Sequence, residues 1–172
     1  FILMDSITSS YDNARILRRL RRNDPTLDYL QISGRNADFN IGLGDDLGWL
    51  GYFVGKSDTL QHLYIFDAPE FALSTNRLGD FIEGVSRNRS IQTLYIGADF
   101  GRGFRQMGDF FKNNNNLREL SFGNLDTMGV ESARSIAFML NQCEQSNLRE
   151  LSFDENNASD EVLAEIVASI ST

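Results

Sequence analysis

A short apolar pattern recurs along the chain at a nearly constant interval. Five segments carry apolar residues at pattern positions 1, 4 and 6, counted from Leu27 in the first segment. The segments are TLDYLQI (26–32), TLQHLYI (59–65), SIQTLYI (90–96), NLRELSF (116–122) and NLRELSF (147–153), and their starts advance by 33, 31, 26 and 31 residues. A repeat of this length predicts stacked copies of one supersecondary unit, which no isolated copy could form stably.

Each repeat alternates a strand-like segment with a helix-like segment. Within the segments, apolar residues alternate with polar residues or Tyr, a period of two that predicts a short strand with one buried face. The intervening stretches carry apolar residues at the i, i+3, i+4 spacing of a helix, in LGWL (47–50), LGDFI (78–82), MGDFF (107–111) and IAFML (136–140). A first helix is expected over 14–22 and a last helix from Asp160. The order predicts parallel strands joined by helical crossovers.

Glycine recurs beside the first apolar residue of three of these helical stretches, at Gly48, Gly79 and Gly108. A glycine inside a helix costs about 1 kcal/mol relative to alanine. Its recurrence therefore predicts that the helix backbone closely approaches a neighbouring strand or helix.

The predicted architecture is a single α/β unit over residues 1–172. We expect a right-handed α/β solenoid of about five repeats, with parallel strands lining a concave face and helices on the convex face. The chain begins with Phe1 rather than Met, and no polar capping repeat follows the last apolar stripe. The sequence is therefore interpreted as part of a longer chain.

Two stretches resemble a known family. VSRNRSIQTLYI (85–96) and FKNNNNLRELSF (111–122) resemble the helix end, Asn-containing turn and L-x-x-L-x-L strand of the helix-containing, ribonuclease-inhibitor-like branch of the leucine-rich repeat family. The resemblance spans roughly residues 14–172 and implies a protein-binding arc. Two features depart from it: the long steps, and pattern position 9, where the family carries Asn or Cys. This chain has Arg35, Ala68, Asp99, Leu125 and Asn156 there, so only the last fits.

Composition excludes several classes of function. With 16 Lys and Arg against 24 Asp and Glu, the net charge of −8 opposes broad binding to nucleic acids or anionic membranes. No apolar run approaches the roughly 18 residues of a membrane span. A single cysteine, Cys143, and a single histidine, His62, exclude an internal disulfide and a His/Cys metal cluster. We expect a reducing, cytoplasmic setting and no cofactor, and the sequons at Asn88 and Asn157 to stay unmodified.

No catalytic site is predicted. GLGDDLG (42–48) and GRGFRQMG (101–108) lack the spacing of a dinucleotide loop and the Lys-Ser/Thr of a P-loop, so they are interpreted as structural turns. His62 and Cys143 lack partners for nucleophilic chemistry in the sequence. The chain is therefore predicted not to be an enzyme.

Two charged clusters have structural interpretations that we prefer. Five arginines between Arg15 and Arg22 are expected to cover the outer face of the first helix, the alternative being a nuclear-import signal or a site for an anionic partner. Glu119 and Glu150 share pattern position 3 in adjacent repeats, so they are expected to be neighbours about 5 Å apart. Arg118 and Arg149 are expected to offset their repulsion in an Arg–Glu ladder.

The predicted binding surface lies on the strands of the first three repeats. Pattern positions 3, 5 and 7 face away from the core and gather aromatic side chains there, which are typical of protein interfaces. The candidate protein-binding residues are Tyr29, His62, Tyr64, Phe66 and Tyr95. The alternative is a ladder of side chains that only stabilises adjacent strands.

The predicted function is a non-catalytic scaffold that binds another protein through its strand face. Repeat folds present extended, rigid surfaces suited to this role. Two alternatives remain open at the level of sequence: a regulator that activates a small GTPase, as some relatives in the resembled branch do, and the substrate-recognition part of a ubiquitin-ligase adaptor.

Overall fold

The computed structural model describes residues 7–41, 46–66, 75–143, 147–153 and 158–170. The strands are β1 (Tyr29–Ser33), β2 (Phe39–Asn40), β3 (His62–Phe66), β4 (Thr93–Gly97), β5 (Glu119–Phe122) and β6 (Glu150–Phe153). The helices are α1 (Tyr11–Arg21), α2 (Asp46–Lys56), α4 (Thr75–Val85), α5 (Gly103–Gln106), α6 (Gly108–Asn113), α7 (Val130–Leu140) and α8 (Asp160–Ile170), with short 3₁₀ turns η2 (Leu125–Thr127) and η3 (Asn141–Cys143).

All six strands form one parallel sheet in the order β2-β1-β3-β4-β5-β6. The register confirms the alignment of the sequence repeats residue by residue. Pattern position 4 forms one row across the sheet, comprising Leu30, Leu63, Leu94, Leu120 and Leu151. Strand β2 was not predicted; it adds a short edge beside β1, where Phe39 is fully buried.

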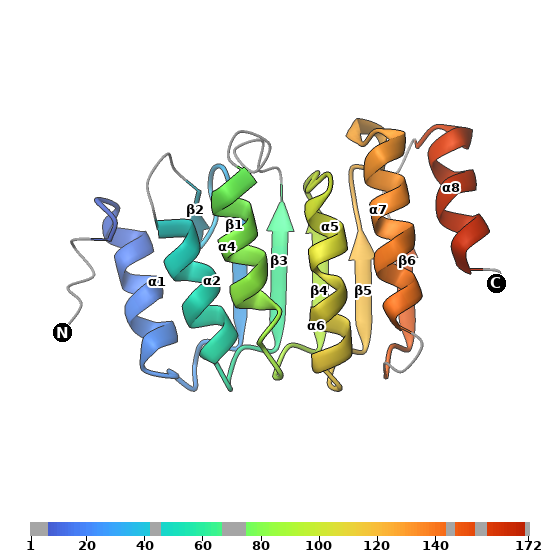
Figure 1. Ribbon diagram of the computed structural model, residues 1–172. Coiled ribbons are helices and arrows are strands. Elements are labelled where there is room, and N and C mark those ends of the chain that lie inside the picture. Colours follow the sequence, from blue (N-terminus) through green and yellow to red (C-terminus); the bar gives the residue numbers. More distant parts are fainter. Residues whose placement is uncertain (1–6, 42–45, 67–74, 144–146, 154–157, 171–172) are drawn as a thin grey trace.

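The core lies between the sheet and a layer of helices. Figure 1 shows α1, α2, α4 and α7 in front of the strands, on one face of the sheet. Pattern positions 1, 4 and 6 of the first four repeats point into this layer and are buried, as the period of two predicted. The predicted α/β class with parallel strands is confirmed.

The predicted right-handed solenoid is not confirmed. The described strands make one open sheet covered by helices on one face, and the repeat pattern accounts for this arrangement without requiring a concave arc. The apolar triplet ensures in-register parallel pairing and a buried face, but it does not determine curvature. We therefore call the face of the sheet that packs against the helices the helix-covered face, and the opposite face the exposed face.

Two helices differ from their predicted extents. Helix α1 begins at Tyr11 rather than at residue 14 because Ser10 caps it, its hydroxyl accepting from the backbone N–H of Asn13 at 3.3 Å. The expected helix around 107–111 is divided into α5 and α6 at Met107, which keeps helical dihedral angles.

Buried asparagine side chains stabilise, through hydrogen bonds, the turns that lead into the central strands. Asn88 and Asn114 are 0% exposed and stand three residues before pattern position 1 of their repeats. The side-chain oxygen of Asn114 accepts from the N–H groups of Asn116 (2.8 Å) and Leu117 (3.1 Å), and its amide donates to the carbonyl of Ile91 (3.0 Å). Each such asparagine thus closes its own turn and binds the preceding repeat.

The predicted close approach of helices occurs between α2 and α4, but at other glycines than expected. A Cβ on Gly51 would lie 2.6 Å from the carbonyl oxygen of Phe81, and one on Gly84 would overlap the backbone of Gly51. At Gly48 and Gly79 an added Cβ would make only ordinary contacts of 3.5 and 3.7 Å, whereas at Gly108 it would come 3.1 Å from the side chain of Gln142. The prediction was therefore right about the kind of contact and wrong about its position at Gly48 and Gly79.

Candidate protein-binding surface

The exposed face of the sheet carries the side chains of pattern positions 3 and 5. Position 3 forms the row Tyr29, His62, Thr93, Glu119 and Glu150, and position 5 forms the row Gln31, Tyr64, Tyr95, Ser121 and Ser152. All are half-buried or exposed, whereas positions 4 and 6 between them are buried in β1, β3, β4 and β5. This face therefore carries aromatic side chains over β1, β3 and β4, and small or acidic side chains over β5 and β6.

Four of the predicted binding residues form one continuous group, which we call the aromatic cluster: Tyr29, Tyr64, Phe66 and Tyr95. The ring centroids of Tyr29 and Tyr64 lie 5.1 Å apart, and those of Tyr64 and Tyr95 lie 6.0 Å apart at an interplanar angle of 21°. Phe66 joins the cluster through Tyr95, with centroids 4.7 Å apart. These separations fall in the range of favourable aromatic pairs.

The ring of Tyr95 lies over two glycines. An added Cβ on Gly97 would come 2.8 Å from Cε1 of Tyr95, and one on Gly123 would overlap its hydroxyl group. The side-chain amide of Asn124 donates to the carbonyl of Gly97 at 2.9 Å, beside the same ring. Glycine at these two positions therefore allows Tyr95 to lie across the sheet toward β5.

Tyr29 has an environment that keeps its phenol protonated. Burial raises the pKa of Tyr29 above its ordinary value of 10.0, and the neighbouring Tyr64 and Asp38 raise that pKa further. The hydroxyl group is thus neutral at physiological pH and can both donate and accept a hydrogen bond. At 43% exposure, Tyr29 is the most open member of the aromatic cluster, since Tyr64, Phe66 and Tyr95 are half-buried.

His62 lies between Tyr29 and Thr93 in the position 3 row and is half-buried. It is the first residue of β3 and lies next to the aromatic cluster, at the end of the sheet where the strands begin. Among the described residues, no group of three or more His, Cys, Asp or Glu side chains could hold a metal ion.

The acidic part of the face differs from its prediction. Glu119 and Glu150 are register neighbours, as expected, and both are exposed. The expected Arg–Glu ladder is absent, because no ion pair joins either glutamate to Arg118 or Arg149 in the described part of the chain. Glu119 instead accepts a hydrogen bond of 3.0 Å from the hydroxyl of Thr93.

The arginine-rich helix α1 has the structural arrangement that we preferred. Its apolar residues Ile16, Leu17 and Leu20 are buried, and Arg19 pairs with Asp24 at 2.7 Å. Together with two hydrogen bonds from Thr26, this arginine lowers the pKa of Asp24 to about 2. Arg15 lies 3.7 Å from Asp12.

Other sequence features acquire structural roles or fall outside the described residues. The amide of Asn88 donates to the carbonyls of Val54 (2.7 Å) and Ser57 (2.9 Å), so this buried sequon is inaccessible in the folded chain. Asn157 and residues 42–45 of the first glycine-rich stretch lie outside the described residues. In the second stretch, Gly101 occupies a turn with φ of +53° ahead of α5. Cys143 ends η3.

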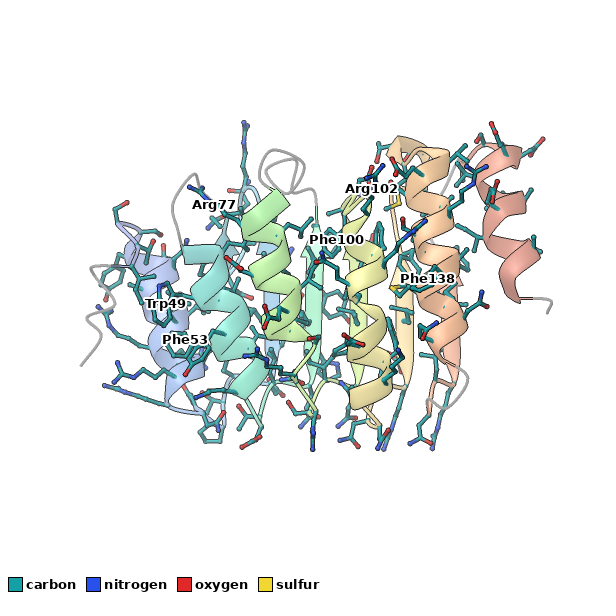
Figure 2. The ribbon with its side chains drawn as sticks, in the orientation of Figure 1. Trp49, Phe53, Arg77, Phe100, Arg102 and Phe138 are labelled. Atoms are coloured by element: carbon teal, nitrogen blue, oxygen red, sulfur yellow. The ribbon has the colours of Figure 1, made fainter. Side chains whose placement is uncertain are left out.

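The helix-covered side also carries aromatic residues. Figure 2 labels Trp49 and Phe53 on α2 and Phe138 on α7. Phe138 is 49% exposed and lies under the guanidinium of Arg105, 5.7 Å from its ring centroid. Tyr52 is 39% exposed, and the ammonium of Lys56 lies 4.6 Å from its ring centroid. Phe53 by contrast is buried, and Trp49 is half-buried.

Comparison with known proteins finds similarity in structure alone. No protein-family model matches the sequence, and no curated protein matches it. A solved structure described as "Leiomodin-1 Actin-Binding Site 2 (ABS2)" is similar with a TM-score of 0.63 and 17% identity, over 92% of this chain and 87% of that one. The tropomodulin C-terminal domain of Caenorhabditis elegans is similar with a TM-score of 0.54 and 13% identity, over 93% and 92% of the two chains.

These matches correct the family resemblance inferred from the sequence. Both of these structures are leiomodin and tropomodulin domains rather than ribonuclease-inhibitor-like leucine-rich repeat proteins, so that resemblance and its description as a solenoid are wrong. The L-x-x-L-x-L spacing misled because it reports a short parallel strand packed on helices, which this fold shares. At these identities, the likeness establishes the arrangement of helices and strands and nothing about function.

Proposed function

We propose that this chain is a non-catalytic protein-binding domain whose contact surface is the exposed face of the sheet around the aromatic cluster. The observation that carries the proposal is the continuous aromatic cluster on a face that none of the described helices covers. Exposed tyrosines offer a large contact area at low conformational cost, which makes them frequent anchors of protein interfaces. His62 is included in this proposed surface because it borders the cluster in the register.

Actin is the first partner to test. One structural neighbour is described as an actin-binding site, and it matches almost the whole of this chain. The regulator of a small GTPase and the ubiquitin-ligase adaptor, which the sequence left open, gain no support from either structural neighbour. A cytoplasmic location accords with an actin-binding role. Among the described residues, no helix is long and apolar enough to cross a membrane.

The first experiment measures binding to monomeric and filamentous actin by the wild-type chain and by a Tyr64→Ala/Phe66→Ala variant. Loss of two interface anchors is expected to weaken binding at least tenfold. The variant also loses three cross-strand aromatic pairs, each contributing about 0.2 to 1 kcal/mol, so the melting temperature is expected to fall by several degrees while the chain stays folded.

Phe138→Ala provides a matched control, because it also removes a part-exposed aromatic ring but lies on α7. This control is expected to bind as the wild type does. Equal binding by all three proteins would exclude the exposed face as the contact surface. A large fall in melting temperature with unchanged binding would show that the aromatic cluster is a structural ladder. No binding by the wild type to either form of actin would exclude actin.

A further inference from the structure

The exposed face of the sheet combines aromatic side chains with carboxylates that have no cationic partner. Glu119 and Glu150 stand opposite each other on β5 and β6, about 4.8 Å apart at the strand spacing. Both side chains are exposed, and in the described chain neither forms an ion pair. Like charges placed directly opposite in a sheet destabilise it. In the described chain, no ion pair therefore offsets the repulsion between these two glutamates.

The acidic pair lies on the same face as the aromatic cluster, two strand positions nearer the strand starts than Tyr95. Thr93, the register neighbour of Glu119, is two residues from Tyr95 on β4 and donates its hydroxyl to the Glu119 carboxylate at 3.0 Å. The Tyr95 ring extends toward β5 over Gly97 and Gly123, on the far side of Tyr95 from Glu119 along the strands. At about 3.3 Å per residue, an extended partner segment of about four residues is long enough to cover this ring and reach the Glu119 carboxylate.

A third carboxylate stands at the opposite border of the cluster. Asp38 accepts a hydrogen bond of 3.0 Å from the backbone N–H of Gln31, whose register neighbour is Tyr64. The aromatic cluster is thus bordered by acidic side chains on both sides. Arg118 and Arg149 immediately precede β5 and β6, but neither is paired with these glutamates in the described residues.

We propose that the partner segment seated on this face presents arginine, with its guanidinium between Glu119 and Glu150 and adjacent apolar atoms on the aromatic cluster. This inference rests on the proposed function and specifies the chemistry of the partner. Arginine fits better than lysine because its planar guanidinium presents several N–H donors and can bind both carboxylates at once through hydrogen bonds. A docked cation also relieves the repulsion between the two glutamates, so the pair is unfavourable in the free chain and favourable in the complex.

The test uses short peptides of defined chemistry rather than an unidentified protein. The probe is acetyl-Gly-Leu-Arg-Leu-Gly-amide, titrated into the full chain and followed by nuclear magnetic resonance shifts of β3 to β6. A matched peptide carries citrulline, which keeps the size and planarity of arginine but is neutral. The arginine peptide is expected to bind about tenfold more tightly, from two exposed ion pairs that each contribute roughly two- to fivefold.

A Glu119→Gln/Glu150→Gln variant isolates the role of the carboxylates. This variant is expected to bind the arginine and citrulline peptides with about equal affinity. Its melting temperature is expected to equal that of the wild type or to rise, because the like-charge pair is gone. The Tyr64→Ala/Phe66→Ala variant is expected to bind both peptides more weakly and to keep the arginine preference.

The outcomes separate this inference from the proposed function. Equal binding of the arginine and citrulline peptides, an arginine preference that survives in the glutamine variant, or no binding of either peptide would each overturn the inference. The proposed function would still stand if the aromatic variant lost affinity for actin. If the aromatic variant and the glutamine variant both bind actin as tightly as the wild type does, the proposed function and this inference are both overturned.

Discussion

At the scale of single residues, buried asparagines connect neighbouring repeats. Asn114 satisfies two backbone N–H groups and one carbonyl that would otherwise be buried without partners. The neighbouring Asn115 is exposed and differs from it only in position. This pair allows the contribution of the buried amide to be measured against a nearly identical control.

We expect Asn114→Ala to lower the free energy of unfolding by about 2 to 3 kcal/mol, because it leaves buried backbone groups unsatisfied. Asn115→Ala is expected to change it by less than about 0.5 kcal/mol. Chemical denaturation of both variants measures the difference. Equal values for the two variants would show that the turn does not depend on the buried amide.

Asp24 links stability to pH at the start of β1. Its hydrogen bonds with Arg19 and Thr26 lower its pKa from 3.8 to about 2, so the folded state prefers the carboxylate form. Its contribution to stability is therefore fully present above the unfolded pKa of about 4 and is lost as the pH falls through about 2.

An Asp24→Asn variant is expected to be less stable than the wild type at pH 6, with a difference that shrinks steadily as the pH is lowered from 5 to 2. Thermal unfolding of both proteins across this range measures the change. A difference independent of pH would mean that the folded structure does not favour the ionised form.

At the scale of elements, the pair α2 and α4 depends on glycines that allow backbone contact. An added Cβ on Gly84 would overlap the backbone of Gly51, and the rigid helices cannot move aside without repacking. Gly79 stands on the same helix with ordinary space around it. The two positions therefore predict opposite effects of the same substitution.

Gly84→Ala is expected to destabilise the chain by about 1 to 3 kcal/mol through overpacking. Gly79→Ala is expected to leave stability unchanged or to raise it by up to about 1 kcal/mol through helix propensity. Denaturation midpoints test both substitutions. A neutral Gly84→Ala would contradict the close contact between α2 and α4.

The elements show what could be predicted from sequence and why. Strands β1, β3, β4, β5 and β6 and their register were predictable because the apolar triplet recurs at the same strand positions. Strand β2 was not, since two residues are too few for a period to be recognised. The tight glycines were missed because backbone approach depends on how two helices cross, and a single helix sequence does not contain that information.

The candidate surface was predictable in part. The alternation of buried and exposed positions placed Tyr29, Tyr64, Phe66 and Tyr95 on one face, and the structure brings them into contact. The unpaired state of Glu119 and Glu150 was not predicted, because adjacency to Arg118 and Arg149 in sequence does not bring the charges together. Their role as binding residues stays a prediction.

At the scale of the whole molecule, packing weakens from the middle of the sheet to β6. Leu117, Leu120 and Phe122 of the fourth repeat are fully buried. The corresponding residues of the fifth repeat, Leu148, Leu151 and Phe153, are only half-buried. Helix α8 also exposes 58% of Val167. Stability is therefore uneven along the chain.

We expect amide hydrogens of β6 and α8 to exchange faster than those of β4 and α4 in the isolated chain, because opening this end exposes less buried surface. Hydrogen exchange followed by mass spectrometry of peptides measures the order. Uniform exchange across all strands would mean that the domain opens only as one cooperative unit.

The central claim is that the exposed face of the sheet is the surface that binds a protein partner. Hydroxyl-radical footprinting tests it most directly, because it reports the solvent access of individual aromatic side chains with and without actin. Protection is expected at Tyr29, Tyr64 and Phe66 on the sheet, while Tyr52 and Phe138 on the helices keep their rates of oxidation. Protection of Tyr52 and Phe138, with the aromatic cluster unchanged, would contradict the account.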